Sequence, residues 1–301
     1  MRYLPYTSPG YQPAWQSATI AEANLILEGG SFRSLFTAGI LDYLMDEKLL
    51  PRHAIGVSAG ALVGVNYVAG SRGRSCFINT KYCDNWHYFS KRSLILTGNA
   101  FSPRYSFNKI PNKLDPFDFE SYHASPLDLV ITTCNIETGE IVYTPVNDPI
   151  IDAAYLQASI SLPLIARTVH VDGVHLLDGG MCNSVPIEYA KKTGVEKQIV
   201  ILTQDASYVK GPDKSLWLMR LRYKRYPHFI DRLENRHLKY NDKYRLITSM
   251  QETGEVFMIR PPMPVRVANM EHNPQMLTEL YEIGYEEGRK NFCALQRFLE
   301  L

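Results

Sequence analysis

The chain has 301 residues, of which 45% are hydrophobic, and a formal net charge of +1 at pH 7. This length fits one large domain or a domain with an added subdomain, and the apolar content is enough to build a core. A net charge near zero creates no overall field that would attract nucleic acid, so we expect no nucleic-acid partner. No apolar run approaches the roughly 18 residues that a membrane-spanning helix needs.

The N-terminal segment and the cysteines carry little functional information. Residues 1–22 lack the apolar centre of a signal peptide and are rich in proline and tyrosine, so we expect an irregular arm. The cysteines are odd in number, and their spacing matches no zinc or redox motif. We therefore expect reduced, mostly buried thiols in a cytoplasmic protein, at Cys76, Cys83, Cys134, Cys182 and Cys293.

Two units of strand, glycine loop and helix follow the arm. Residues 24–28 form a short apolar strand, glycines follow at once, and residues 35–50 show apolar positions with helical spacing. The second unit repeats this order, with a turn at 56–60 and an apolar helix over 61–68. Successive units of this kind predict an α/β fold with a mainly parallel sheet covered by helices.

Residues 71–125 are less regular and mix glycine, asparagine, serine and proline with many aromatic residues. This segment is interpreted as a lid or wall for an apolar substrate or, with equal weight, as an insertion with its own small core. The elements expected after it are strands over 127–136, 140–143, 197–203 and 256–260, a hairpin turn at 172–173, and helices over 150–160, 186–194 and 274–301.

Residues 214–250 are basic and aromatic, with few acidic residues among them. The favoured interpretation is a solvated helix pair. The alternative is a surface that contacts anionic lipid headgroups, which would make the protein peripheral to a membrane.

Ser58 lies in a Gly-x-Ser-x-Gly stretch between a predicted strand and a predicted helix. A serine on such a tight turn points outward, and Gly56 and Gly60 allow the strand and helix to pack closely behind it. The helix N-terminus also favours a developing anion there. The alternative interpretation is a capped helix start with no chemistry.

Two further stretches complete a possible acyl-transfer site. Asp178 begins an Asp-Gly-Gly turn, and the Gly29-Gly30-Ser31 loop follows the first strand. Each lies just after a predicted strand, so in a parallel sheet all of them would gather at the carboxyl edge with Ser58. Ser58 then supplies the nucleophile, Asp178 the base, and the loop N–H groups the oxyanion donors. The alternative for Asp178 is a plain Asp-Gly turn.

Four motifs occur in a set order: GGSFRS, TAGILD, GVSAG and LLDGG. In this order they resemble the patatin-like phospholipases, most closely the bacterial branch, over about residues 24 to 210. Residues 236–242 and the tail after 255 also resemble that branch, more weakly. The resemblance implies a three-layer α/β/α fold and a serine lipid acyl hydrolase that uses a Ser–Asp dyad without a catalytic histidine. The sequence itself contains no metal-binding cluster and no nucleotide-binding glycine motif, so we expect no metal and no cofactor.

By position, the resemblance assigns roles to individual residues. It makes Ser58 the nucleophile of an elbow formed with Gly56 and Gly60, and Asp178 the base. The remaining matches are the oxyanion-hole residues Gly29, Gly30, Ser31 and Arg33, and the glycines of the dyad turn, Gly179 and Gly180.

The oxyanion motif departs from the family pattern at two positions, because Ser31 and Ser34 replace glycines. A serine N–H still donates, but the Cβ of Ser31 either narrows the approach to the loop or requires a backbone angle that glycine takes more easily, so rate or substrate range is expected to differ. Arg33 matches the pattern and either braces the loop, places charge near the oxyanion, or forms a surface salt bridge.

The resemblance also predicts how the chain is divided. Residues 1–22 are the arm, 23–210 the patatin-like catalytic domain, and 211–301 a helical extension with one strand that packs on the same domain. The expected substrates are lipids or other esters.

Three other functions are considered. One is an α/β-hydrolase with a Ser–Asp–His triad, for which chain order allows His228, His237 or His272. The second is an acyltransferase that uses the same dyad, and the third is a non-catalytic lipid-binding protein of the same fold. Reaction with a serine-directed fluorophosphonate would distinguish the third from the enzymes.

Overall fold

Eight strands form one sheet within residues 3–301, which are the residues that the computed structural model describes. Along the sheet the order is β5-β6-β3-β2-β1-β7-β8, and β4 pairs with β3 outside this path. The strands are β1 (Thr19–Leu27), β2 (Leu49–Val57), β3 (Asp128–Asn135), β4 (Glu140–Pro145), β5 (Val169–Val171), β6 (Val174–Asp178), β7 (Lys197–Ile201) and β8 (Phe257–Ile259).

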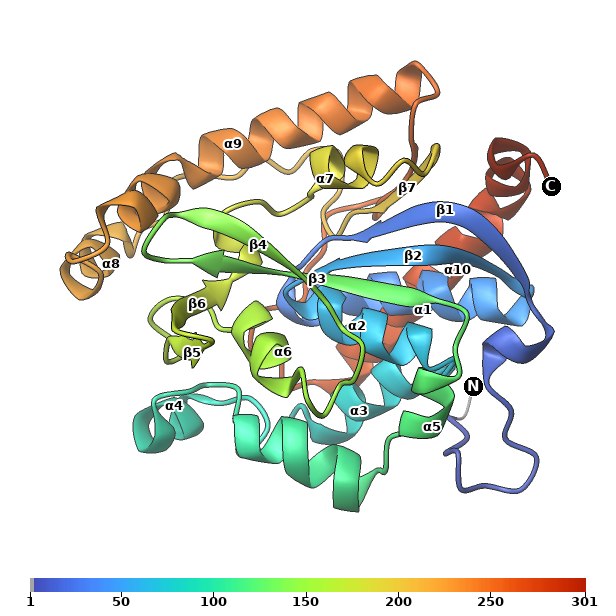
Figure 1. Cartoon of the computed structure of the whole chain (residues 1–301), viewed down its shortest axis with the longest axis horizontal. Helices are drawn as coiled ribbons and strands as arrows, with labels where there is room; N and C mark the ends of the chain where they lie inside the picture. Colours follow the sequence, from blue (N-terminus) through green and yellow to red (C-terminus); the bar gives the residue numbers. More distant parts are fainter. Residues whose placement is uncertain (1–2) are drawn as a thin grey trace.

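The central strands β3, β2, β1, β7 and β8 run parallel to one another, whereas β4, β5 and β6 pair antiparallel. Helices cover both faces of the sheet (Figure 1). Residues 25 and 27 of β1 face one layer and residue 26 faces the other, because successive side chains of a strand alternate. The predicted α/β fold with a mainly parallel sheet is therefore confirmed.

The first helical layer contains α1 (Ser34–Asp46), α2 (Ala59–Val68), α3 (Arg74–Tyr82) and α10 (Pro274–Leu299). The second contains α7 (Ile187–Lys192) and the long helix α9 (Pro227–Glu252), which is drawn along the upper side of Figure 1. The remaining helices are α4 (Lys91–Thr97), the π-helix η3 (Tyr105–Leu114), α5 (Phe119–His123), α6 (Ala153–Ser159), α8 (Leu216–Arg222) and the 3-10 turns η1 (Ala14–Ser17), η2 (Ser31–Arg33) and η4 (Gly179–Met181).

The start of the first strand and the end of the first helix differ most from the expected boundaries. The first strand begins at Thr19, inside the expected arm, because residues 19–21 pair with residues 49–51 of β2. For the same reason the first helix ends at Asp46, and positions 49–50 belong to β2. Residues 1–2 of the arm lie outside the described residues.

The segment 71–125 is more regular than expected, since it contains α3, α4, η3 and α5. Several of these helices are shorter than three turns, so their apolar periodicity is hard to recognise in sequence. Polar residues within the segment act as helix caps: the Ser90 side chain accepts from the N–H of Ser93, and Asp118 accepts from that of Ser121. The turns at 138–139 and 172–173 and the expected downstream elements are present.

Among residues 3–301, no helix combines enough length with enough apolar character to cross a bilayer.

Candidate active site

Ser58 occupies a strained turn between β2 and α2. Its φ is 54° and its ψ is −127°, a conformation that is uncommon for a residue with a side chain. The two flanking glycines allow this turn. A Cβ on Gly56 would lie 2.5 Å from the Cα of Ala61, and one on Gly60 would lie 2.5 Å from the carbonyl oxygen of Leu27.

Asp178 reaches Ser58 by a route that differs from the one expected. Its strand, β6, runs antiparallel to β3, so the assumption of a parallel strand is wrong. Strand β4 pairs along one edge of β3, so β2 and β6 both pair along the opposite edge. On that edge β2 pairs with residues 128–132 of β3, and β6 pairs with residues 133–135. Val57 pairs with Thr132 and Asp178 with Thr133, so β2 and β6 end facing each other. Ser58 and Asp178 therefore meet where the two strand ends meet.

The Ser58 hydroxyl donates a hydrogen bond of 2.5 Å to Oδ2 of Asp178. The other carboxyl oxygen, Oδ1, accepts a 2.7 Å hydrogen bond from the N–H of Gly180. Asp178 is only 1% exposed, and this burial raises its pKa from 3.8 to about 6, against the opposing effects of Ser58, the Gly180 N–H and the charge of Arg236. The carboxyl group is thus a stronger base than an exposed aspartate.

The loop after β1 passes directly beside Ser58. A Cβ on Gly29 would lie 2.6 Å from the Cβ of Ser58, so only glycine allows this close approach. Within the described chain, no protein acceptor takes a hydrogen bond from the backbone N–H of Gly29, Gly30 or Ser31. Ser31 has a φ of 54°, which supports the second of the two consequences considered for its Cβ, a backbone angle that glycine takes more easily.

Side chains of the loop tie it to a distant segment. The hydroxyl of Ser31 donates to the carbonyl oxygen of Asn269 at 2.7 Å, and Arg33 donates to its side-chain oxygen at 2.8 Å. The hydroxyl of Ser34 donates to the carbonyl oxygen of Ser31 at 2.8 Å. Of the roles considered for Arg33, these contacts favour bracing the loop.

A cavity of about 550 Å³ opens at Ser58. Most of its surface is apolar, with contributions from α2, α6 and the segment 71–125. Of the two interpretations of that segment, the wall of an apolar cavity is therefore supported. Representative lining residues are Leu62, Ile78, Phe89, Phe101, Phe107 and Leu156.

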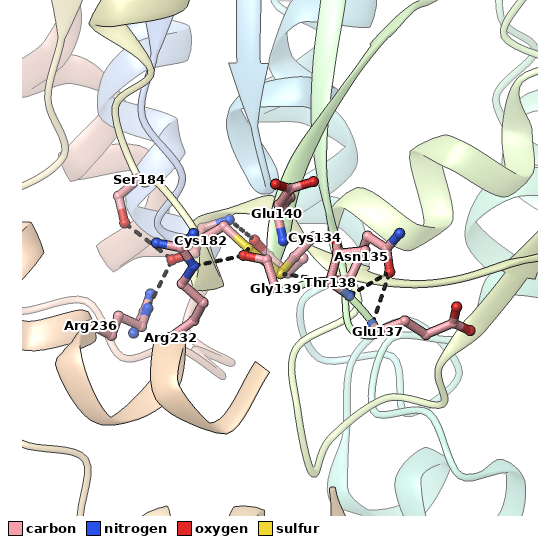
Figure 2. Close-up of a disulfide and its surroundings, with 12 residues drawn as sticks. Cys134, Asn135, Glu137, Thr138, Gly139, Glu140, Cys182, Ser184, Arg232 and Arg236 are labelled. Atoms are coloured by element: carbon pink, nitrogen blue, oxygen red, sulfur yellow. Dashed lines mark hydrogen bonds between the residues drawn. A yellow bond between two sulfur atoms is a disulfide. The ribbon is translucent and has the colours of Figure 1, made fainter. Parts of the chain in front are cut away.

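The cysteine expectation is wrong for two of the five residues. Cys134 and Cys182 form a disulfide with their Cα atoms 5.9 Å apart, although they are 48 residues apart in sequence (Figure 2). Pairing of β3 with β6 and the turn η4 bring them together, which spacing alone does not reveal. Among the free cysteines, Cys83 is buried and Cys293 is exposed.

Within residues 3–301, none of the three histidines considered for a triad makes a hydrogen bond to Ser58 or Asp178. Among the described residues, the hydrogen bonds of the Asp178 carboxyl group come from Ser58 and Gly180. His272 contacts the carbonyl oxygen of Cys83 instead, and His228 and His237 lie on α9. No group of three His, Cys, Asp or Glu residues with metal-binding geometry occurs in the part of the chain that is described.

Sequence reasoning missed several residues that contact the site from behind. Arg236 of α9 donates to the carbonyl oxygen of Gly180 at 2.8 Å. Glu28, just before the glycine loop, is 1% exposed and accepts from Tyr240 and Tyr244 of α9. The available signals were the acidic residue that ends the apolar strand 24–28 and the weakly family-like segment 236–242.

The sequence profile of the patatin-like phospholipases matches residues 25–191, more than half of the chain, and this range includes Ser58, Asp178 and the glycine loop. The chain belongs to the patatin-like phospholipase family. A second profile, a domain of unknown function called DUF6363, matches residues 226–300. As a family member the protein is a lipid hydrolase, and its substrates are lipids.

This patatin-like phospholipase is similar in sequence to two curated proteins and aligns with one solved structure. The uncharacterized protein YjjU of Escherichia coli K12 is 23% identical over 290 residues, which cover 91% of this chain and 78% of YjjU. Lysophospholipase NTE1 of Scheffersomyces stipitis is also 23% identical over 290 residues, 90% of this chain but only 18% of that protein. In crystal structures, VipD of Legionella pneumophila aligns with a TM-score of 0.44 and 10% identity, covering 94% of this chain and 67% of VipD.

Proposed function

We propose that the protein hydrolyses carboxylic esters of lipids through a Ser58–Asp178 dyad and an acyl-enzyme intermediate. The single observation that carries this proposal is the 2.5 Å hydrogen bond from the Ser58 hydroxyl to a buried Asp178 at the mouth of an apolar cavity. A nucleophile in contact with a base is the arrangement that covalent catalysis requires.

In the first step, Ser58 Oγ attacks the ester carbonyl carbon while Asp178 takes the hydroxyl proton. The negative charge that develops on the carbonyl oxygen is stabilised by backbone N–H groups of Gly29, Gly30 and Ser31. The bond between the carbonyl carbon and the alcohol oxygen then breaks. The leaving alcohol receives the proton from Asp178, and the acyl group remains on Ser58.

In the second step, water attacks the acyl-enzyme carbonyl and gives its proton to Asp178. The bond from the carbonyl carbon to Ser58 Oγ breaks, the fatty acid leaves, and Ser58 recovers the proton. The cavity beside Ser58 holds the apolar part of the substrate.

The test is the hydrolysis of a chromogenic ester and of phospholipids by wild type, Ser58→Ala and Asp178→Asn. Each variant is checked for folding. We expect kcat to fall at least about a hundredfold in both variants, because each removes a group that takes part in bond formation or proton transfer. Wild type should also be labelled by a fluorophosphonate, and Ser58→Ala should not. An inactive, unlabelled wild type would point to a lipid-binding protein, and acyl transfer to an added alcohol in preference to water would point to an acyltransferase.

We further propose that the surface of α8 contacts anionic membranes. Three large apolar side chains on this seven-residue helix are exposed: Trp217 at 67%, Leu221 at 64% and Leu218 at 38% of its surface. They are accompanied by exposed basic residues, namely Arg220, Arg222, Lys224 and Arg225. Exposed tryptophan and leucine beside basic residues are typical of a protein surface that binds at an anionic bilayer interface.

Co-sedimentation with vesicles tests this surface. Wild type is expected to bind vesicles of phosphatidylcholine with phosphatidylglycerol better than vesicles of phosphatidylcholine alone. The double variant Trp217→Ser with Leu221→Ser should weaken binding about tenfold or more, because it removes two apolar side chains that enter the bilayer interface in the bound state. The control is Leu301→Ser, a leucine 60% exposed at the C-terminus, which Figure 1 draws at the end opposite α8. Equal binding by all three proteins would disprove the proposal.

A further inference from the structure

One face of α9 contacts both halves of the site from behind. Arg236, Tyr240 and Tyr244 follow each other at intervals of four, so they lie on the same side of the helix. Arg236 contacts the turn that carries Asp178, and the two tyrosines contact the residue that precedes the oxyanion loop.

Arg236 acts on the dyad turn through hydrogen bonding and charge. Its Nε donates a 2.8 Å hydrogen bond to the carbonyl oxygen of Gly180, whose own N–H is bound to Asp178. The guanidinium also lies near enough to favour the charged form of Asp178. In Figure 2 Arg236 and Arg232 extend from neighbouring turns of α9 toward the turns on either side of the disulfide.

Glu28 is the second point of contact, and its two carboxyl oxygens have unequal support. Oε2 accepts from the N–H of Thr203 at 2.6 Å, from its hydroxyl at 3.0 Å and from Tyr244 at 2.6 Å. Within the described residues, Oε1 accepts only from Tyr240, at 2.7 Å. Because Glu28 is buried and directly precedes Gly29, its orientation affects where the loop N–H groups lie.

We propose that α9 is the positioning element of the active site: Arg236 holds the Asp178 turn, and Tyr240 holds Glu28 and thereby the oxyanion loop. This inference rests on the proposed dyad mechanism. It also gives a role to the region that matches the domain of unknown function, since α9 lies within residues 226–300. None of these α9 residues contacts the ester itself in this proposal, so they are positioning residues.

Several charged or titratable groups surround this contact and affect its pH dependence. Asp178 is faced by Ser58, by the Gly180 N–H and by Arg236. Arg236 in turn is faced by Tyr240 on its own helix and by Tyr208, Lys210 and Asp213 from the segment after β7. Burial lowers the pKa of Lys210 to about 8, so Lys210 stays protonated around pH 6, where Asp178 titrates.

The first experiment compares pH profiles of kcat/KM for Arg236→Gln, Arg236→Lys and the control Arg232→Gln. Arg232 makes the matching contact one turn earlier, with Nε donating to the carbonyl oxygen of Gly139 at 2.7 Å. Removing the charge beside Asp178 should raise the pH at which kcat/KM falls on the acid side of the profile (its acid limb) by about half to one pH unit in Arg236→Gln. It should also lower kcat about tenfold, through misplacement of the base.

Arg236→Lys keeps the charge but not the planar guanidinium. Its acid limb should stay at the wild-type position while kcat falls, and Arg232→Gln should change neither. If the acid limb of the Arg236→Gln profile lies at the same pH as that of the Arg232→Gln profile, the proposed role of Arg236 is disproved. Should Arg236→Gln fail to fold, a shift of the acid limb in Arg236→Lys would overturn the charge argument instead.

The second experiment compares Tyr240→Phe with Tyr244→Phe. Each change removes one tyrosine hydroxyl of α9 that donates to the Glu28 carboxyl group. Among the described residues, only Tyr240→Phe leaves an oxygen of Glu28 without a donor. We expect kcat to fall about tenfold for Tyr240→Phe and less than about threefold for Tyr244→Phe, with KM changed by less than about twofold in both. Equal effects of the two changes, or effects confined to KM, would contradict the proposal.

The Ser58→Ala variant separates the two levels of the argument. If Ser58→Ala keeps its activity, the dyad mechanism fails, and the positioning inference fails with it. If Ser58→Ala is inactive while Arg236→Gln and Tyr240→Phe match wild type, only the role of α9 is disproved.

Discussion

Asp178 combines two properties that oppose each other. Its burial raises its pKa to about 6, which makes it a better base, but the same burial makes its charged form costly for the folded protein. The strained φ of Ser58 and of Ser31 is a similar feature, because unfavourable backbone angles are often kept where chemistry needs them. At this site, stability and function therefore favour different side chains.

The raised pKa predicts the acid limb of the reaction. Asp178 must be deprotonated to accept the Ser58 proton, so kcat/KM should fall about tenfold for each pH unit below about 6. Initial rates on a neutral ester between pH 4.5 and 8 measure this. A limb near pH 4 would mean that the base is a solvated carboxyl group or another residue.

Stability should depend on pH in the direction set by the same shift. The folded-state pKa exceeds the unfolded value of 3.8, so the contribution of Asp178 to stability is fully present below about pH 4 and is lost as the pH rises through about 6. Asp178→Asn removes that loss. The variant should unfold with a free energy about 1–3 kcal/mol higher than wild type at pH 8, and the gain at pH 4.5 should be about a third of the gain at pH 8.

Urea unfolding at the two pH values measures the difference between variant and wild type. The asparagine oxygen still accepts from Gly180 and its NH2 group donates to Ser58, so the turn is expected to survive the change. A variant that is less stable than wild type at pH 8 would show that the carboxylate contributes more through its hydrogen bonds than it costs through burial.

At the scale of elements, α1 and α10 illustrate what a pattern leaves open. The sequence predicted both helices, since each has apolar residues at helical spacing. It did not predict that they pack together, because periodicity identifies an apolar face without identifying its partner. In the structure their backbones approach closely at glycines: a Cβ on Gly284 would overlap the carbonyl oxygen of Phe36, and one on Gly39 would overlap that of Tyr281.

Gly284→Ala should therefore force the two helices apart. We expect a loss of about 3 kcal/mol or more in the free energy of unfolding, because overlap with backbone atoms cannot be relieved by a rotamer change. Gly211→Ala is the control, since a Cβ there would meet no atom within 4 Å. Thermal unfolding compares the two variants with wild type, and a Gly284→Ala protein as stable as Gly211→Ala would refute the close packing.

At the scale of the whole molecule, long-range pairing brings together residues whose partners are not evident from sequence. The disulfide closes a separation of 48 residues beside the dyad turn, and the predicted division of the chain near residue 210 stays a prediction. The C-terminal region adds β8 to the common sheet and places α10 against α1.

The disulfide predicts a difference in thiol content. After unfolding without reductant, three thiols should react, those of Cys76, Cys83 and Cys293, and all five should react after reduction. Reduction should also lower the free energy of unfolding by about 2–4 kcal/mol, because the unfolded chain loses a cross-link. Five reactive thiols before reduction would support the original expectation of reduced cysteines instead.

Local features of the sequence were enough to predict the fold class, the elbow at Ser58 and the glycine loop. Tight turns and helix starts depend on residues that are close in sequence, such as Gly56 and Gly60 around Ser58. The left-handed angle at Ser31 was one of two consequences that the departure from glycine left open, and the structure decided between them.

Tertiary structure alone decided how these parts meet. Three features join segments that are far apart in the chain. They are the antiparallel pairing of β6 with β3, the hydrogen bond from Arg33 to Asn269, and the hydrogen bond from Tyr240 of α9 to Glu28. Such contacts depend on which helix and sheet faces pack together and on the register of the strands. Local sequence patterns do not determine these, because they follow from the burial of the whole core at once.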